Sequence, residues 1–193
     1  DVAKNNLKNF KNITFHNIDV ESMNNINVKF DFAYSLGVLH HIKDTENGIL
    51  NCSKQLKKGS PFLIYLYYNF ENRKFTFKLI WFLSNFLRKI ISNLPFTLKK
   101  IITDFLALII YLPLKYIYKF MNLFSLNIKK FPLSYYHNKT FYMMRTDSLD
   151  RFGTIIEKRF SKKEIIFLLK KSGFENITFS DTEPYWTALC YKK

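Results

Sequence analysis

One stretch of the chain, FDFAYSLGVLHHIKDTENGIL (residues 30–50), constrains its fold more than any other. A short and largely apolar run ends near Gly37, two adjacent histidines follow, and a segment with helical spacing comes next. Such a run is typical of a strand that is buried on both faces of a parallel sheet. The stretch therefore predicts a strand that leads through a turn into a helix.

The segments around this stretch extend the pattern into a sheet. Residues 1–10 are predicted to form a helix, and Ile13–Phe15 a strand that ends near Asp19. The helix after the histidines is predicted to stop at Gly59, and the run PFLIYLYY (residues 61–68) is predicted to form the next strand. Helices that alternate with apolar strands indicate βαβ units and a parallel sheet.

The C-terminal part predicts one more helix and two strands. Ser161 is followed three residues later by Glu164, which is a capping-box signature, and Gly173 is expected to end that helix. The runs NITFSD and YWTALCYK have the spacing of an antiparallel pair. Residues 132–154, just before this part, have the composition of a loop.

A block of different character, residues 73–131, separates these parts. It has no glycine and no strand alternation, Asp104 is its only acid, and Pro95 and Pro113 are expected to divide it into helical pieces. Its longest uncharged stretch, 105–114, is about half of the ~20 residues that a membrane span needs, so a span is not predicted. One helical stripe consists of Leu79, Phe82, Leu83, Phe86, Leu87, Ile90 and Ile91.

The formal net charge of +15 raises nucleic acid or an anionic membrane as partners, although a composition rich in Lys, Asn, Ile, Phe and Tyr accounts for it equally well. Because lysines alternate with large apolar residues and no nucleic-acid motif occurs, nucleic acid is not favoured. Two distant cysteines show no disulfide framework, which favours the cytoplasm. The oligomeric state is not predicted.

The order of elements in residues 31–67 resembles the central part of class I S-adenosylmethionine-dependent methyltransferases. In that family a strand ends in a Ser-x-x-Val-Leu-His-His run, as at Ser35, and a helix, a turn with lysine and glycine, and a further strand follow. The resemblance covers roughly residues 1–68 and 160–193. It implies methyl transfer from S-adenosylmethionine on a Rossmann-like α/β fold, with a mostly parallel sheet and a C-terminal antiparallel pair.

The resemblance also assigns three parts and a cofactor site. Residues 1–72 would be a partial methyltransferase core on the cofactor side, 73–131 a basic, apolar helical insertion or lid, and 132–193 the acceptor-side loop with the C-terminal part of the core. Ligands of open α/β sheets bind beyond the carboxyl ends of strands. The implied cofactor-binding residues are Asp19, Val20, Ser35, Leu36, Gly37 and His40, and the less favoured alternative for Asp19 is an ordinary turn acid.

The family's glycine-rich loop and the acid that holds the ribose belong to two strands that would precede Asp1. We therefore expect an N-terminally truncated fragment that lacks the first two strands. Such a fragment would bind S-adenosylmethionine weakly or not at all and would be inactive alone.

The adjacent histidines do not predict a metal site, because neighbouring side chains point in different directions on a strand and on a helix. We expect His40 to face the cofactor or the substrate, where it is a candidate general base, and His41 to pack at the helix start. A metal would need further ligands, and neither HExxH nor CxxC occurs.

The acceptor is predicted only as a class: a small-molecule or lipid-linked hydroxyl or carboxylate. The candidate acceptor residues carry either a phenol or a charge. The charged residues of 145–154 could instead pair among themselves. The helical block is either an inert subdomain or a lid that touches a membrane surface through residues 75–130. The alternative to an enzyme is a basic module that binds an anionic membrane or nucleic acid. The candidate acceptor residues are Tyr135, Tyr136, Arg145, Asp147 and Arg151.

Overall fold

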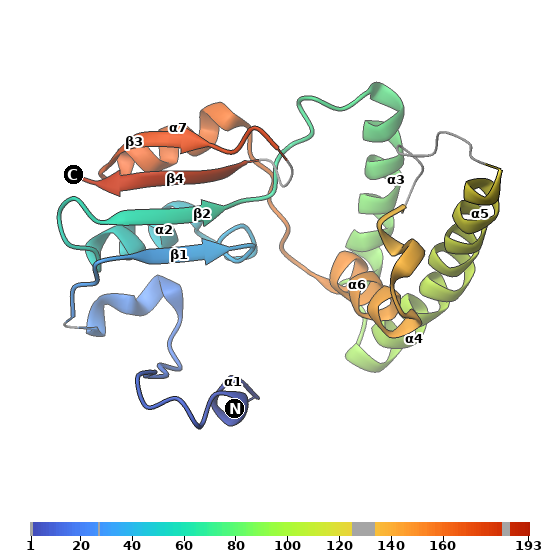
Figure 1. The fold of residues 1–193 in the computed structure, drawn as a ribbon, viewed down its shortest axis with the longest axis horizontal. Coiled ribbons are helices and arrows are strands. Elements are labelled where there is room, and N and C mark those ends of the chain that lie inside the picture. Colours follow the sequence, from blue (N-terminus) through green and yellow to red (C-terminus); the bar gives the residue numbers. More distant parts are fainter. Residues whose placement is uncertain (1, 27, 125–133, 183–185) are drawn as a thin grey trace. The chain divides into compact units, whose positions relative to one another are not determined.

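The structure of the chain, a computed structural model, describes residues 2–26, 28–124, 134–182 and 186–193. These residues form two compact units (Figure 1). Unit 1 consists of Asp1–Asn69 and Arg159–Lys193, and unit 2 of Phe70–Lys158. Unit 2 thus reaches past the predicted insertion 73–131, whose last residues, 125–131, lie outside the described part of the chain.

Unit 1 contains a four-stranded sheet with the order β1-β2-β4-β3. β1 and β2 are parallel, and β4 is antiparallel to both β2 and β3. The mixed α/β class, the parallel pair and the C-terminal antiparallel pair are therefore confirmed. The prediction of a mostly parallel sheet is wrong for the described residues, because β4 enters the sheet beside β2 and makes two of its three pairings antiparallel. The bounds of the strands are Ala33–Leu36 (β1), Pro61–Tyr65 (β2), Phe174–Phe179 (β3) and Thr187–Lys192 (β4).

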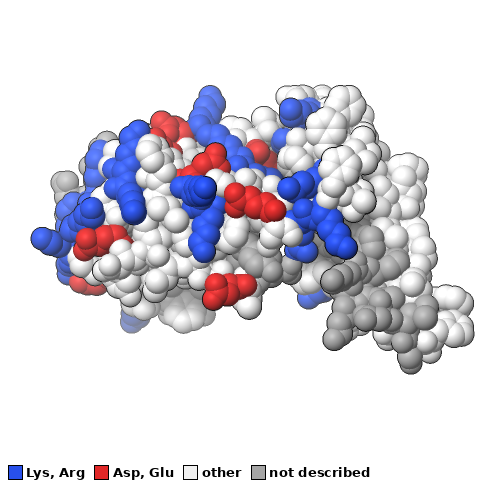
Figure 2. All heavy atoms as spheres, turned by 90° about the horizontal axis from the view of Figure 1, so that it is seen from above, with Lys and Arg blue, Asp and Glu red and all other residues white. Residues whose placement is uncertain are grey.

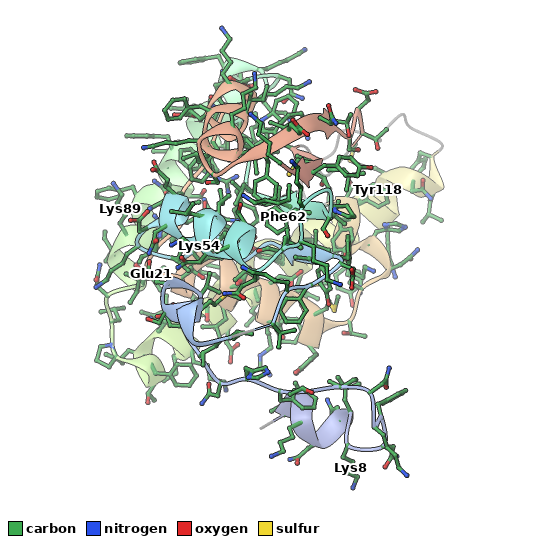
Figure 3. The ribbon with its side chains drawn as sticks, turned by 90° about the vertical axis from the view of Figure 1, so that its left-hand side faces the viewer. Lys8, Glu21, Lys54, Phe62, Lys89 and Tyr118 are labelled. Carbon is green, nitrogen blue, oxygen red and sulfur yellow. The ribbon has the colours of Figure 1, made fainter. Side chains whose placement is uncertain are left out.

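Two helices, α2 (Thr45–Lys54) and α7 (Lys162–Lys171), cover one face of this sheet (Figure 1). The Asp44 side chain caps α2, and the predicted capping box of Ser161 and Glu164 starts α7. Side chains of both helices and of the sheet share one apolar core, in which Phe62 of β2 is fully buried (Figure 3). This core also contains Leu39, Ile49, Ile64, Ile165, Leu169, Phe174, Ala188 and Cys190.

The opposite face of β1 is open to solvent, so the prediction that this strand is buried on both faces is wrong. Tyr34 is 68% exposed and Leu36 is 49% exposed, whereas Ala33 and Ser35 on the other face are half-buried. Every second residue of the run lies on the open face, because side chains alternate along a strand. The exposed residues are Phe30, Phe32, Tyr34, Leu36 and Val38.

The N-terminal segment forms less structure than its sequence predicts. The helix expected over residues 1–10 is limited to α1 (Val2–Asn6), and the strand expected at Ile13–Phe15 is not formed. These residues pair with no strand in the described part of the chain, and a strand without a ladder has no partner for its backbone groups. A short 3-10 helix, η1 (Val20–Asn25), follows directly after Asp19.

Unit 2 is entirely helical in its described residues. Its central helix, α6, contacts α3, α4 and the π-helical turn η2. The loop predicted for residues 132–154 is wrong, because η3 and α6 occupy most of it. The bounds are Phe75–Ile91 (α3), Phe96–Leu106 (α4), Ala107–Tyr111 (η2), Leu112–Leu123 (α5), Ser134–Asn138 (η3) and Phe141–Gly153 (α6).

Pro113 does not divide the block as predicted. α4, η2 and α5 run on as one helix, Phe96–Leu123, and the π-helical turn lies just before the proline. Proline lacks the backbone N–H of an α-helical turn, and the wider turn accommodates this loss. By length and composition alone, this helix of 28 residues is long and apolar enough to cross a membrane.

Candidate functional site

The turn after β1 is built around Gly37. Its φ of +73° lies in the left-handed region, where residues with a Cβ are strained. The Gly37 N–H donates to the Tyr65 carbonyl over 3.2 Å, which ties the ends of β1 and β2 together. A Cβ built at Gly37 would meet nothing within 4 Å, so the space beside this backbone is open. A ligand can therefore approach the chain closely at this point.

Gly48 of α2 brings the two predicted parts of the cofactor site together. A Cβ at this glycine would lie 2.5 Å from Cδ1 of Ile42, 3.2 Å from Cδ2 of Leu39 and 3.5 Å from Cγ1 of Val20. The start of η1 and the residues after β1 therefore meet at the first turn of α2. Glycine is needed there because it leaves room for both segments.

Hydrogen bonds fix η1 against α2. The Asn51 side-chain amide donates to the carbonyls of Val20 (3.1 Å) and Glu21 (3.0 Å). The Glu21 carboxylate in turn accepts from the Asp44 N–H over 2.8 Å. Figure 3 shows η1, with Glu21, beside α2, with Lys54 at its end. Asp19 is exposed, and its carboxylate accepts from the Glu21 N–H over 2.9 Å, so it acts as the cap of η1.

His40 lies fully buried behind the turn. Its ring stacks on Tyr67 with 3.7 Å between ring centroids, and the His41 ring centroid lies 4.1 Å away. Neither ring nitrogen has a hydrogen-bond partner within the described residues. Burial, together with charge repulsion from His41 and Arg159, lowers the pKa of His40 to about 3. The imidazole is therefore neutral at physiological pH.

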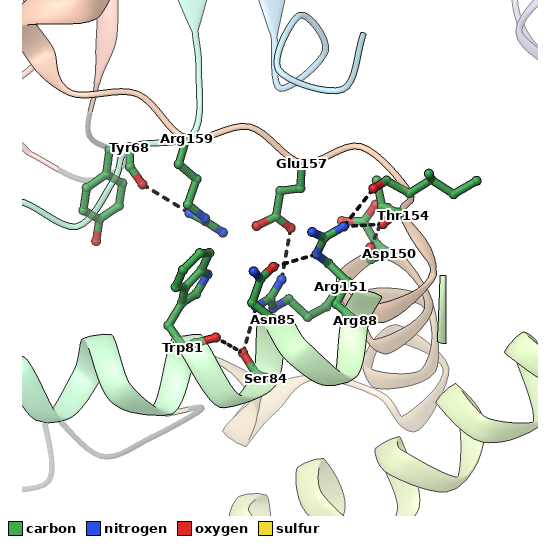
Figure 4. A network of polar contacts seen from close by, with 11 residues as sticks. Tyr68, Trp81, Ser84, Asn85, Arg88, Asp150, Arg151, Thr154, Glu157 and Arg159 are labelled. Carbon is green, nitrogen blue, oxygen red and sulfur yellow. Dashed lines mark hydrogen bonds and ion pairs between the residues drawn. The ribbon is translucent and has the colours of Figure 1, made fainter. Parts of the chain in front are cut away.

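Three further side chains complete this aromatic cluster, and the sequence did not single them out. Tyr65 is the last residue of β2 and Tyr67 lies two residues beyond it, and the Arg159 guanidinium lies 5.0 Å from the centroid of the Tyr67 ring. Arg159 also donates to the Tyr68 carbonyl over 3.2 Å (Figure 4). Burial raises the pKa of Tyr65 to about 12. The tyrosines had a sequence signal, since residues two apart on a strand share a face, but Arg159 had none.

The cluster can bind and orient a ligand more readily than it can move a proton. A pKa of about 3 means that the neutral imidazole has little affinity for a proton, so His40 is a weak general base. His41, which is half-buried, is the more accessible of the pair. Within the described ranges, no three His, Cys, Asp or Glu side chains are grouped so that they could hold a metal ion.

The candidate acceptor residues all lie in unit 2, on η3 and α6. Arg145 donates from Nε to Asp104 Oδ1 over 2.8 Å, and the Tyr136 hydroxyl donates to Asp147 Oδ2 over 2.9 Å. Arg151 donates to Glu157 Oε2 over 3.0 Å and to Ser84 Oγ over 2.8 Å. The alternative that the charges of 145–154 pair among themselves is therefore wrong.

Each candidate acceptor residue therefore has a contact within unit 2. The exposed Tyr135 ring lies 4.7 Å from the Lys139 ammonium nitrogen. Burial and the hydrogen bond to Asp147 raise the pKa of Tyr136. Their acceptor role stays a prediction.

Comparison with known proteins bears on unit 1. The family model of a methyltransferase domain matches residues 1–64. Residues 1–64 are therefore similar to a methyltransferase domain, in agreement with the resemblance seen in the sequence. The match ends within β2, so unit 2 and the C-terminal strands lie beyond it.

One similar solved structure is that of an O-methyltransferase family protein from Burkholderia thailandensis. The two share 9% sequence identity with a TM-score of 0.44, and the similarity covers 94% of this chain and 35% of that protein. The chain thus spans about a third of the length of that protein. No curated protein matches the chain.

Proposed function

We propose that the chain contributes to methyl transfer from S-adenosylmethionine to an oxygen of a small-molecule or lipid-linked acceptor. One observation carries this proposal: the region that is similar to a methyltransferase domain contains all of the predicted cofactor-binding residues. The packing of Val20 and Leu39 on either side of Gly48 supports it, because it brings the start of η1 and the turn after β1 to the same end of α2.

The residues present suit the needs of the cofactor. Bound S-adenosylmethionine supplies an electrophilic methyl group. Asp19 offers an exposed carboxylate that can accept from the adenine amino group, and the backbone at Leu36 and Gly37 allows close approach. The neutral His40 is fully buried behind the turn, where its ring packs against Tyr65 and Tyr67.

The low pKa of His40 favours a carboxylate over a hydroxyl as the acceptor. Methylation of a hydroxyl requires that a base removes its proton, whereas a carboxylate is already ionised at neutral pH. A buried imidazole with a pKa of about 3 is poorly suited to that removal. We therefore assign His40 a positioning role next to a carboxylate acceptor.

A labelled-methyl assay tests this function. The chain, and any longer natural protein that contains it, are incubated with methyl-labelled S-adenosylmethionine and with lipid and aqueous extracts, and labelled methyl esters are identified by their release as methanol in mild alkali. Alkali-labile label is expected where the cofactor site is complete, with weak or no transfer by residues 1–193 alone, and alkali-stable label would contradict the carboxylate acceptor. No transfer, together with a salt-dependent gel shift on nucleic acid, would instead favour the binding module.

A matched pair of glycines provides the control. Gly37 and Gly59 have φ values of +73° and +80°, and neither has an atom within 4 Å of a built Cβ. Gly59 precedes the amino end of β2, whereas Gly37 follows the carboxyl end of β1. Gly37→Ala is expected to lower transfer at least tenfold, and Gly59→Ala is expected to leave it unchanged. Equal losses would mean that backbone strain alone explains the effect.

A further inference from the structure

The outer side of α3 is apolar. Its exposed stripe, called the α3 stripe below, consists of Leu79, Phe82, Leu83, Phe86, Leu87 and Ile90. The residues are three or four positions apart and so lie on one side of the helix. Phe82 is 62% exposed and Phe86 is 60% exposed. Only Ile91, at the end of the stripe predicted from the sequence, is buried.

The inner side of the same helix is polar. Arg88 is buried, and its Nη1 donates to the carbonyls of Thr154 (2.7 Å) and Ile155 (3.0 Å), while its Nε donates to Asn85 Oδ1 (2.9 Å). Figure 4 shows this network beside the pair of Arg151 and Glu157. The hydrogen-bonding groups of α3 therefore face the interior of unit 2, and its aromatic and aliphatic side chains face outward.

The long helix Phe96–Leu123 repeats this arrangement. Thr103 is fully buried, and its carbonyl accepts from the equally buried Ser148 hydroxyl over 2.7 Å. Large side chains on the outer side are exposed, and only 17% of the most apolar window of this helix is buried. Figure 2 shows few charged side chains on the α5 side of unit 2. The exposed residues include Ile101, Phe105, Leu108, Ile109, Ile117, Phe120 and Leu123.

The exposed apolar surface points to an apolar environment around unit 2. Water-soluble proteins bury large apolar side chains and rarely expose extended apolar patches. The interior of unit 2 combines hydrogen-bonded polar groups with a small apolar cluster of Ile91, Ala107, Tyr111, Met144 and Phe152, and many large apolar side chains stay outside it. This distribution suits a helix bundle in contact with lipid.

The charged side chains around these surfaces favour lipids with anionic headgroups. Lys78 and Lys89 of α3 and Lys100 and Lys119 of the long helix are exposed. The only acid of residues 73–131, Asp104, pairs closely with Arg145 and lies 3.9 Å from the Lys100 ammonium, so it offsets little of the charge of the other lysines. Basic side chains next to an inserted apolar face attract anionic headgroups.

We propose that unit 2 binds the surface of an anionic phospholipid bilayer. The α3 stripe and the outer side of Phe96–Leu123 enter the interface, and the exposed lysines contact the headgroups. The inference goes beyond methyl transfer and does not depend on it, because the binding assay contains neither cofactor nor acceptor.

The position of the lysines favours a helix that lies in the interface over one that crosses the bilayer. The stretch between Lys100 and Lys115 is about 21 Å long at 1.5 Å per residue, which is short of the ~30 Å hydrocarbon core. Asp104 and its partner Arg145 would also lie within that core. An in-plane helix keeps all of these charges at the headgroups.

Vesicle flotation of the 193-residue chain tests the proposal. We expect at least tenfold stronger binding to vesicles with about one-third phosphatidylglycerol than to pure phosphatidylcholine, with partial release in high salt because cations attract the headgroups. The double variant Phe82→Glu/Phe86→Glu is expected to bind at least tenfold more weakly. No binding to anionic vesicles by a chain whose circular dichroism shows it to be folded would overturn the proposal.

Phe167 of α7 provides the matched control. It is 62% exposed, as is Phe82, but it lies in unit 1. Phe167→Glu is expected to leave vesicle binding unchanged, and an equal loss in this variant would show that any exposed phenylalanine suffices. Phe86→Trp adds a direct readout, since brominated lipid should quench the new tryptophan.

Other occupants of the apolar surface give different results. If light scattering shows a dimer that the Phe82→Glu/Phe86→Glu variant dissociates, while neither form binds vesicles, a second copy covers the surface. If the chain stays with vesicles after washing in alkaline carbonate, the long helix spans the bilayer. Either result overturns surface binding.

Discussion

The helices of the two units differ in where most of their large apolar side chains lie. In unit 1, α2 and α7 turn Ile49, Ile165 and Leu169 inward onto the sheet, and all three are fully buried. In unit 2, α3 turns Arg88 inward and keeps Phe82 outside. Both kinds of helix have the same 3.6-residue period. Periodicity therefore identifies an apolar face, but the partners of a helix decide whether this face becomes interior or surface.

The largest effect is expected from the core of unit 1. Phe62→Ala should lower the free energy of unfolding of this unit by about 3–5 kcal/mol, because it leaves a cavity at a fully buried site. Urea unfolding is followed by Trp186, which packs against this core, in a Trp81→Phe background. Phe82→Ala in unit 2, at an exposed site, should change stability by less than about 0.5 kcal/mol. Similar losses in both variants would contradict the contrast between the units.

Replacement of a buried polar residue should lower the free energy of unfolding of unit 2 to a comparable extent. Arg88→Leu removes the donor from the carbonyls of Thr154 and Ile155, and we expect a loss of about 2–4 kcal/mol. Trp81 reports on this unit in a Trp186→Phe background. Lys89→Leu, one residue further along α3, removes an exposed cation and should change the free energy of unfolding little. A more stable Arg88→Leu variant would show that the interior of unit 2 prefers apolar side chains after all.

The pH dependence of unit 1 should reflect His40. Its pKa falls from 6.5 in the unfolded chain to about 3 in the fold, so unfolding takes up a proton between these pH values. Stability should therefore fall as the pH falls, by about 1.4 kcal/mol per pH unit, or about 2 kcal/mol between pH 6.5 and 5. His41, Arg159, Tyr65 and Tyr67 surround the ring.

His40→Phe keeps the stack on Tyr67 and removes the titrating group, so its Trp186-detected stability should be flatter over this range. Trp81-detected unfolding of unit 2 serves as the internal control. If the slope persists in His40→Phe, another group is responsible.

The smallest effect concerns the two turns of unit 1. Gly37→Ala and Gly59→Ala should each cost about 1–2 kcal/mol, since both need the left-handed backbone and neither side chain would clash. Chemical denaturation measures both. A clearly larger cost at Gly37 would mean that the space beside it closes in solution.

The sequence predicted the elements that form their own hydrogen bonds and the order in which they occur. The capping box at Ser161, the strand that ends at Leu36 and the C-terminal antiparallel pair are local signals, and the structure confirms them. The prediction from the sequence failed for Ile13–Phe15, because a strand forms only when it pairs with another strand and that partner is not a local feature of the sequence.

The site was partly predictable for the same reason. Gly37 and Asp19 were found through residues close in sequence, whereas Arg159 reaches Tyr67 only through the bridge between Tyr68 and Phe160. The acceptor residues were assigned to a loop, since the alternation of charged and apolar residues in α6 hides its helical face. Their partners, Asp104 and Glu157, lie outside the segment that drew attention.

The π-helical turn before Pro113 has a consequence for how unit 2 can evolve. The Leu112 N–H bonds to the Ala107 carbonyl, five residues back, so the turn contains one residue more than an α-helical turn. Each residue of an α-helix advances the side chains by about 100° around the axis. Because 107–111 already holds one surplus residue, deleting one residue there would leave an ordinary α-helical turn and keep the side chains of α5 on the same sides. A deletion in the α-helical part, 96–106, would instead rotate one part of the helix against the other by roughly 100° and turn a different set of side chains outward. The π-helical turn is thus the place in this helix where the loss of one residue leaves the outer surface unchanged.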